Sequence, residues 1–289
     1  FIPLLSSFAC AIPGIMATRV ISNTRDRLVT ILIAPLMTCS ARLPVYALLI
    51  AAFVPDREVG WFNLQGIVLF SLYLAGILGA MLVALVMRLG ERGNVHHPLL
   101  MELPAWRLPG LRNLGIGLYE RGLIFLRRVG GIILALTVIV WVLSSYPAAP
   151  ADASAPAITY SFAGMIGQFI QPLFAPLGFG WQICIALIPG MAAREVAVGA
   201  LGTVYALSGD EAAVGEALTG LIAADWSLAT ALALLAWYVF APQCISTLAV
   251  IKRETQGWRI PLIAAAYLFA LAWLAAFATY QIAAALGAG

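Results

Sequence analysis

The sequence predicts an all-α fold, a polytopic transmembrane helical bundle with two pseudo-repeated segments that contain broken helices. Of the 289 residues, 63% are hydrophobic and 10% are charged, whereas an average soluble domain is roughly 45–50% apolar. Six runs reach the length of about 20 apolar residues that a bilayer requires. Proline-containing motifs also recur in the same order in the two halves of the chain. The net charge of +3, with no acidic or basic block, argues against a nucleic-acid partner.

The predicted spans divide one membrane domain into three parts. Residues 1–55 hold the first broken segment and its span, residues 56–160 hold transmembrane spans and a cytoplasmic amphipathic helix, and residues 161–289 hold the second broken segment and the C-terminal spans. Two shorter apolar segments, Phe1 to Ala17 and Tyr160 to Leu177, fit half-helices, re-entrant hairpins or parts of longer spans. The six full-length runs are Leu28 to Val54, Leu64 to Met87, Ile124 to Tyr146, Trp181 to Leu207, Leu228 to Ile251 and Pro261 to Leu286.

Basic residues predict the orientation of these spans, because short cytoplasmic loops collect Lys and Arg. The bases gather in three regions, one around Arg19, one between Arg88 and Arg128, and one around Lys252. The alternating loops are acidic, so we expect them outside. A hairpin over Tyr160 to Leu207 makes this order self-consistent and leaves the C-terminus external. The stretch Leu111 to Arg128 is typical of a basic amphipathic helix that lies on the inner surface.

Two further expectations concern the N-terminus of the chain and its four cysteines. The chain begins at Phe1 inside a hydrophobic run and without an initiator Met, which suggests a fragment of a longer protein. All four cysteines lie in apolar runs, so we expect free intramembrane thiols rather than a disulfide framework. They are Cys10, Cys39, Cys184 and Cys244.

A Pro-Gly pair interrupts an apolar segment once in each half of the chain. The first is Pro13-Gly14, followed by Arg19, and the second is Pro189-Gly190, followed by Arg194. Pro removes a backbone donor, so a break of this kind survives in lipid only where the freed groups face protein or a watery cavity. Interrupted helices at corresponding places in two halves indicate the binding site of a transporter.

A second recurring element places an Ala-Pro pair shortly before a cysteine. It occurs in APLMTC, which ends at Cys39, and in APQC, which ends at Cys244. Arg42 follows the first copy close to the predicted middle of the membrane, where an unpaired charge costs roughly 2.5–3.5 kcal/mol. Arg42 therefore either lines a site or neutralises carbonyls freed at the proline breaks. Glu195, next to Arg194, either offers an oxygen ligand to a cation or balances a nearby arginine.

The thiols at the breaks point to a transition-metal cargo. Cys10, Cys39 and Cys244 each lie beside a predicted break, and thiols suit Fe(II), Zn(II) and Cu(I) rather than Mg(II) or Ca(II). A transport site must also release its ion, so incomplete ligation is expected. Cys184 lacks such a context and is expected to be a buried filler. The loop histidines His96 and His97 are expected to be surface residues.

The chain resembles the membrane region of the ferrous iron transport protein B (FeoB) family over nearly its whole length. The motifs that carry the resemblance are CAIPGIMATR, RDRLVTILIAPLMTCSARLPVY, MELPAWRLP, GMAAREVAVGALGTVY and APQCISTLAVIKRE. In that family the paired segments are called Gate motifs, and the resemblance implies Fe(II) import across the bacterial inner membrane. It places the motif cysteines at Cys10, Cys39 and Cys244 and the motif acids at Glu102 and Glu195.

The same resemblance implies parts that this sequence does not contain. The family carries an N-terminal GTP-binding domain, but no P-loop motif occurs here. GTP and Mg are therefore expected only through that domain, as is any enzymatic activity. Implied partners are membrane lipid, the N-terminal G domain, small Feo accessory proteins and further copies of the chain.

The predicted roles are transient Fe(II) ligation by the three motif cysteines, a carboxylate ligand at Glu195, and stabilisation of the gates by Arg42 and Arg194. One alternative is a carrier of nucleosides or other solutes, which would need a dense cluster of aromatic and amide groups. Another is an intramembrane cysteine enzyme, which would need a general base at membrane depth. A structural subunit would leave the duplicated breaks without a reason.

Overall fold

The computed structural model describes residues 1–60, 62–89, 110–147, 157–192, 194, 196–205, 211–242 and 244–287. The predicted all-α fold is confirmed, since the described chain is helical apart from one short antiparallel ribbon of β1 and β2. The elements are α1 (Ile2–Ser7), α2 (Ala11–Ala17), η1 (Thr18–Val20), α3 (Thr24–Ile33), η2 (Ala34–Leu36), η3 (Ser40–Arg42), α4 (Leu43–Phe53), β1 (Glu58–Val59), β2 (Phe62–Asn63), α5 (Leu64–Leu89), α6 (Leu111–Ser145), η4 (Ala157–Tyr160), α7 (Phe162–Phe174), η5 (Ala175–Leu177), α8 (Trp181–Ala192), α9 (Val196–Val204), α10 (Glu211–Asp225), α11 (Leu228–Phe240), α12 (Ile245–Thr255) and α13 (Arg259–Ala285).

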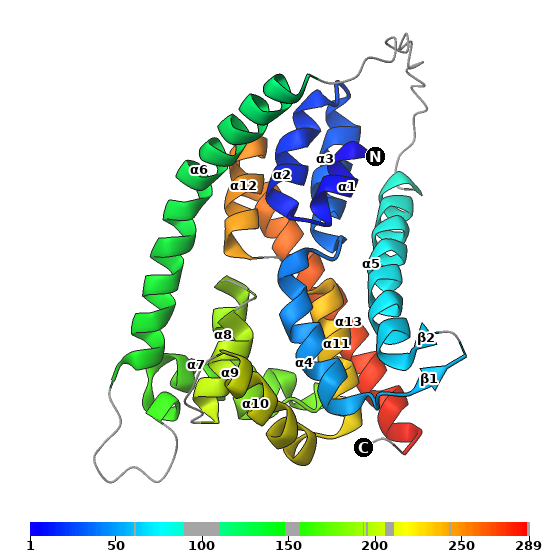
Figure 1. The fold of residues 1–289 in the computed structure, drawn as a ribbon, viewed down its shortest axis with the longest axis vertical. Coiled ribbons are helices and arrows are strands. Elements are labelled where there is room, and N and C mark those ends of the chain that lie inside the picture. Colours follow the sequence, from blue (N-terminus) through cyan, green and yellow to red (C-terminus); the bar gives the residue numbers. More distant parts are fainter. Residues whose placement is uncertain are drawn as a thin grey trace.

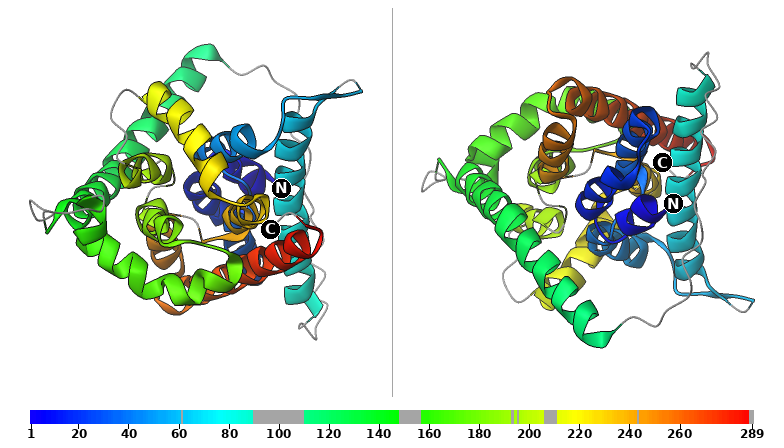
Figure 2. Two further views of the ribbon diagram at one scale, coloured as in Figure 1. Left: turned by 90° about the horizontal axis from the view of Figure 1, so that it is seen from below. Right: turned by 90° about the horizontal axis from the view of Figure 1, so that it is seen from above.

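Two broken helices form the centre of the bundle. One is α3 followed by α4, and the other is α11 followed by α12; each pair runs the length of the molecule with a short extended segment at mid-height (Figure 1). The unbroken helices α5 and α6 lie at opposite edges, with the broken spans between them (Figure 2). Among the described residues, four helices or broken helices are long and apolar enough to cross a membrane, or five if the bent pair α7–α8 is counted.

The core is built mainly on α4, α8, α9 and α11. An aromatic cluster ties it to α13, because the Trp237 ring lies edge-on to Phe174 at 5.2 Å and to Phe269 at 5.3 Å between centroids. Small residues allow α13 to approach closely, and Ala272 and Ala276 are fully buried at its contact with α11. Close approach through small residues is typical of helices packed within a membrane.

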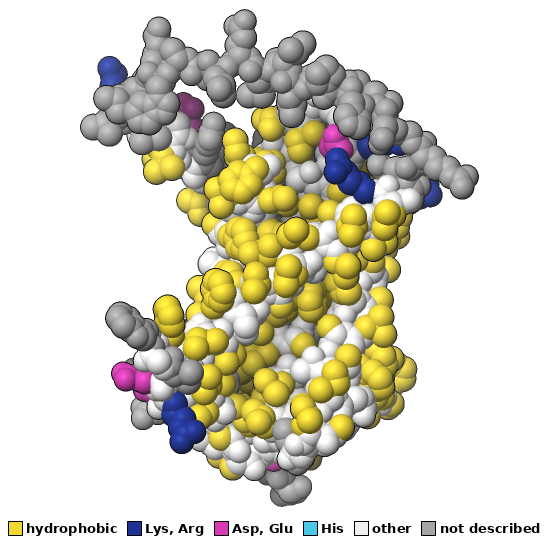
Figure 3. All heavy atoms as spheres, turned by 90° about the vertical axis from the view of Figure 1, so that its right-hand side faces the viewer, with side chains coloured by type: hydrophobic (Ala, Val, Ile, Leu, Met, Phe, Trp, Pro, Cys, Tyr) yellow, Lys and Arg dark blue, Asp and Glu magenta, His cyan; other side chains and the backbone are white. Residues whose placement is uncertain are grey.

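The outward face of α5 is apolar over most of its length. Figure 3 shows hydrophobic side chains across this face, with charged groups at its two ends. Exposed residues include Phe70, Leu78, Met81 and Leu82. A helix whose outer surface is uniformly apolar between charged ends fits contact with lipid.

Within the described residues, the three basic regions begin at one end of the molecule. The turn after α2, the end of α5 and the α12–α13 turn are together at the top of Figure 1, whereas the β-ribbon and the C-terminus are at the bottom. This arrangement agrees with the predicted alternation of loops. The predicted hairpin within Tyr160 to Leu207 is also present, since the chain bends by 109° between α7 and α8 and returns through α9.

The predicted surface helix is replaced by a longer one. Instead of an amphipathic helix over Leu111 to Arg128 and a separate span, α6 runs unbroken for 35 residues. At 1.5 Å per residue it is about 52 Å long, compared with about 30 Å for a hydrocarbon core. The glycines at 122, 130 and 131 do not stop the helix, so the basic half continues in line with the apolar half.

Candidate ion pathway at the helix breaks

The first Pro-Gly pair lies inside a helix rather than at its break. The break is at Phe8–Cys10, and Pro13 is the third residue of α2, where a missing N–H costs no helical hydrogen bond. Gly14 faces α1, and a Cβ there would be 2.0 Å from Ser7 Oγ and 2.7 Å from Pro3 O. Gly14 therefore allows α1 and α2 to fold back on each other as a tight hairpin.

The second Pro-Gly pair also lies inside a helix, but on the other side of its break. Helix α8 continues through Pro189 to Ala192, and the chain then turns at Arg194 into α9. A Cβ on Gly190 would be 3.0 Å from the Cβ of Ala197. The prediction that each pair marks the break is thus wrong by a few residues, because both glycines serve the close approach of two hairpin arms.

The α3–α4 break contains Cys39. After η2 the chain is extended from Met37 to Cys39, and η3 then begins the lower half of the span. Helix α5 packs directly on this break, since a Cβ on Gly76 would be 2.9 Å from Thr38 Oγ1 and 3.2 Å from Leu36 O. Thr38 and Cys39 are both buried.

The α11–α12 break has the same form and contains Cys244. Helix α11 ends at Phe240, and α12 begins after Cys244. The Cys244 thiol lies 3.4 Å from Thr247 Oγ1, one turn into α12. Ser246 and Thr247 are almost fully buried, so polar groups are concentrated where this span opens.

All three motif cysteines occupy the same kind of position. Cys10, Cys39 and Cys244 are the N-cap residues of α2, η3 and α12, with extended ψ angles of 134°, 158° and 153°. The segments of Cys10 and Cys39 are joined, because Ser40 Oγ donates a 2.9 Å hydrogen bond to Ala9 O. Within the described residues, no three His, Cys, Asp or Glu side chains meet in a group that would hold a metal ion.

Cys184 differs from the other three thiols. It lies in the middle of α8, is fully buried, and belongs to the main hydrophobic core. Its position agrees with the predicted role of filler. Glu102, Glu195, His96 and His97 lie outside the described residues.

Arg42 and Arg194 converge on the C-terminal end of α11. Arg42, which is fully buried, donates to Val239 O at 2.8 Å and to Pro35 O at 3.3 Å. Arg194, which is 3% exposed, donates to Tyr238 O at 3.3 Å, to Ala241 O at 2.9 Å and to Pro242 O. These bonds match the interpretation in which buried arginines neutralise carbonyls freed at the proline breaks.

The sequence explains why these carbonyls are free. In an uninterrupted helix, Tyr238 O would accept from the N–H of residue 242, but Pro242 has none. The end of a helix also carries partial negative charge, which favours a cation nearby. Two guanidinium groups from the two halves of the chain supply that charge.

Several buried polar atoms around the two breaks have no hydrogen-bond partner in the described structure. They are Thr38 Oγ1, Arg42 Nε, Arg194 Nε and Ser246 Oγ. Buried polar atoms are normally bonded to protein, water or an ion. Their concentration at the breaks marks this region as the polar interior of the bundle.

An ion cluster joins the two halves at the basic end. Arg19 donates to Glu254 through Nε at 2.8 Å and through Nη2 at 2.6 Å, and Arg27 approaches the same carboxylate at 3.2 Å. This bidentate bond raises the pKa of Arg19 above its ordinary value. Glu254 is not among the predicted site residues, although the sequence carries a signal for it, an acid at the end of a span directly after Lys252 and Arg253.

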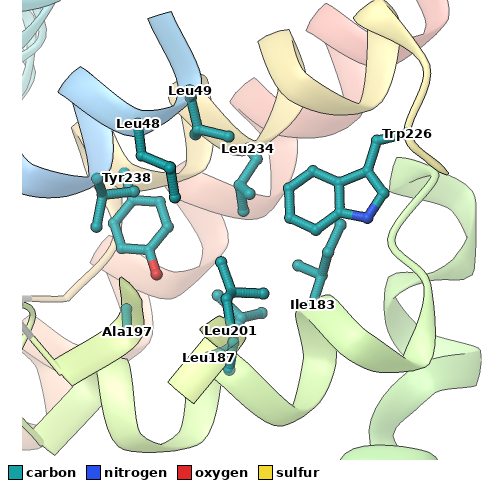
Figure 4. A pocket seen from close by; sticks show the side chains of 11 residues that line it. Leu48, Leu49, Ile183, Leu187, Ala197, Leu201, Trp226, Leu234 and Tyr238 are labelled. Carbon is teal, nitrogen blue, oxygen red and sulfur yellow. The ribbon is translucent and has the colours of Figure 1, made fainter. Parts of the chain in front are cut away.

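A small apolar cavity lies between α4, α8, α9 and α11 (Figure 4). Leu48, Leu187 and Leu234 face into it, Trp226 lies at one end, and the Tyr238 hydroxyl points toward Ala197 at the other. Its volume of about 10 Å³ is close to the minimum for one water molecule. The cavity therefore offers no room for a nucleoside.

Family models match most of the chain. A model named Gate, described as "Nucleoside recognition", matches residues 1–53 and 126–258. A model described as "Ferrous iron transport protein B C terminus" matches residues 69–121. No solved structure matches the chain.

Curated relatives match over almost the whole of this chain. An Fe(2+) transporter FeoB from Leptospira interrogans is 39% identical over 98% of the chain and 42% of its own length. FeoB from Staphylococcus aureus is 36% identical over 98% of the chain and 40% of its length. A fusion of Fe(2+) transport protein A with FeoB, from Porphyromonas gingivalis, is 35% identical over 98% of the chain and 37% of its own length. The chain thus spans about two fifths of the length of these relatives, and it belongs to the ferrous iron transport protein B family.

Proposed function

We propose that this membrane domain conducts Fe(II) across the bacterial inner membrane, as the permease part of a GTPase-linked transporter. The observation that carries the proposal is the shared position of three thiols. Cys10, Cys39 and Cys244 each cap a half-helix at a break, on segments from both halves of the chain. Thiols are suitable ligands for Fe(II), and broken helices at mid-membrane are where transporters bind their substrates.

Incomplete ligation would suit transport rather than storage. A structural metal site closes with about four ligands, which would hold the ion too tightly for release. A pathway in which one or two thiols hold the ion at a time would bind it and release it. Glu195 is proposed to add a carboxylate oxygen, and Glu102 to help stabilise the gates.

The two buried arginines are proposed to hold the breaks open. Arg42 bonds both Pro35 O and Val239 O, so it links the first broken span to the second. Arg194 bonds three carbonyls of the second break. Without these cations the freed carbonyls would face an apolar interior unpaired, at a cost of about 1–3 kcal/mol each.

The remaining parts of the transporter are proposed to lie outside this chain. An N-terminal G domain would bind GTP and Mg and drive the gates. The relative from Porphyromonas gingivalis is named as a fusion with Fe(2+) transport protein A, which supports a small Feo protein as partner. Surrounding lipid would contact the apolar face of α5, and further copies of the chain are proposed as partners.

The test is Fe(II) uptake by the full-length protein in proteoliposomes. Replacing Cys10, Cys39 and Cys244 together by Ser should reduce uptake to the level of protein-free vesicles, because the hydroxyl is a poor ligand for Fe(II). Cys184→Ser is the matched control, since this thiol lies in the apolar core, and uptake should persist. Unchanged uptake by the triple variant would contradict the thiol pathway.

Competition separates the proposed cargo from the alternative carrier. Zn(II) should compete with Fe(II) more strongly than Mn(II), because it binds thiols more tightly. Nucleosides should have no effect. Inhibition by nucleosides, with no inhibition by Zn(II), would favour the solute carrier instead.

A further inference from the structure

Three backbone carbonyls at the end of α11 form a set of oxygen donors of the kind that binds cations. Three backbone oxygens, those of Tyr238, Ala241 and Pro242, converge on one guanidinium group. The three residues belong to one helix end and the unwound segment that follows it. Unwound carbonyls and half-helix C-termini are the groups with which broken-helix transporters coordinate cations.

The surroundings of these oxygens leave a cation as their natural partner. Tyr238 and Ala241 are each 5% exposed, so water is largely excluded. Pro242 lacks the N–H that would have bonded Tyr238 O. Hard oxygen donors suit divalent cations such as Mn(II), Ca(II) and Fe(II).

Arg194, which binds these oxygens, does not belong to the helix whose end it caps. Arg194 lies in the turn between α8 and α9, not on α11. Its Nε has no hydrogen-bond partner in the described structure, so the guanidinium is held through its two terminal nitrogens. A shift of this turn would withdraw the cation and leave α11 intact.

We propose that the carbonyl oxygens of Tyr238, Ala241 and Pro242 form a second, hard-donor cation site, which Arg194 fills in the state shown and vacates when a divalent metal ion passes. Pro242 is two residues from Cys244, so the oxygen site and a thiol share one break. The inference rests on the proposed permease function for its role in transport. The existence of the site does not depend on that function.

The test measures Mn(II) binding to purified full-length protein without nucleotide, with Cys10, Cys39 and Cys244 replaced by Ser. Electron paramagnetic resonance reports free Mn(II), and the difference between variants cancels metal bound elsewhere. Adding Arg194→Met, of similar length and no charge, should create one further Mn(II) site with at least tenfold tighter binding than the parent shows. Equal binding by parent and variant would overturn the proposal.

Two matched variants identify the carbonyls as the ligands. Arg194→Lys keeps a tethered cation and should bind no additional Mn(II). Pro242→Ala, added to Arg194→Met, restores an N–H donor for Tyr238 O and should remove the gained site. Retention of the gained site in the Pro242→Ala variant would show that other groups bind the metal, and would overturn the assignment.

Stability supplies a second readout if Arg194→Met is poorly folded. The variant should unfold at a lower temperature than its parent and should recover with millimolar Mn(II), because the metal replaces the missing cation. A variant that stays unfolded at every Mn(II) concentration would contradict the site. If the cysteine variant loses Fe(II) uptake but Arg194→Met gains no Mn(II) site, the proposed permease function would stand and only the proposed oxygen site would be refuted.

Discussion

The α1–α2 hairpin and the α8–α9 hairpin carry the same sequence signature but place its arginine in opposite environments. In the first hairpin, Arg19 has a side chain that is 52% exposed and pairs with Glu254 at the basic end of the bundle. In the second, Arg194 is 3% exposed and binds the carbonyl end of α11. A repeated motif therefore predicts a repeated hairpin, but not a repeated role for its charge.

The difference follows from what each hairpin packs against. Hairpin α1–α2 lies beside α12 and η2, close to the surface where the basic loops gather. Hairpin α8–α9 packs against α4 in the main core, next to a helix end that Pro242 has left unpaired. The internal symmetry of the sequence is thus broken at the two arginines.

The largest expected effect separates these arginines directly. Arg194→Ala should lower the free energy of unfolding by at least about 3 kcal/mol, because it leaves three buried carbonyls unpaired at roughly 1–3 kcal/mol each. Arg19→Ala should cost about 1 kcal/mol or less, because the Arg19 side chain is half exposed and the 3% exposed Glu254 carboxylate keeps its second partner, Arg27. Thermal unfolding in detergent measures both. Equal losses would show that the two hairpins are equivalent after all.

An intermediate effect is expected from the glycines. Gly14→Ala should destabilise by about 1–3 kcal/mol, because overpacking must push α1 away from contacts of 2.0 Å and 2.7 Å. Gly190→Ala should cost less than about 1.5 kcal/mol, since its closest contact would be 3.0 Å. Unfolding temperatures of the two variants give the comparison. A more damaging Gly190→Ala would mean that the second hairpin is the tighter one.

The smallest expected effect concerns the ion cluster. Coupling between Arg19→Ala and Glu254→Gln in a double-mutant cycle should be about 0.2–1 kcal/mol and should shrink as salt is raised. Arg25 provides the matched control, since its side chain makes no ion pair within the described residues. Coupling that is insensitive to salt would indicate that Glu254 acts through packing and not through charge.

The sequence predicts the broken spans, and it places two of the breaks correctly, at the Ala-Pro-Cys motifs that end at Cys39 and Cys244. Hydropathy and recurring prolines were sufficient for α3–α4, α11–α12 and the α8–α9 hairpin, because lipid imposes length and apolarity on every span. The breaks near Pro13 and Pro189 lie a few residues from these prolines, because Pro13 is in the first turn of α2, where its missing N–H costs no hydrogen bond, and α8 continues through Pro189. The sequence likewise predicts two helices where α6 is one, because the change from basic to apolar residues does not interrupt the helix.

The partners of the charged residues were the least predictable part of the site. The sequence predicts that a charge at Arg42 is costly, but nothing in its own segment shows that Val239, 197 residues away, supplies the carbonyl. Glu254 was overlooked because its two partners lie on η1 and α3, at the other end of the chain. Contacts of this kind depend on tertiary packing, which a single sequence does not encode locally.

The N-cap position of the three motif thiols links their direction to the winding of a helix. As N-cap residues, Cys10 and Cys244 have extended ψ angles of 134° and 153°, whereas a helical residue has a ψ of about −42°. Extending α2 or α12 by one residue at its start would therefore rotate the cysteine about its Cα–C bond and point its thiol in a different direction. Each thiol is one residue of helical winding away from a different orientation, so the pathway could be rearranged by local coiling without displacement of an entire span.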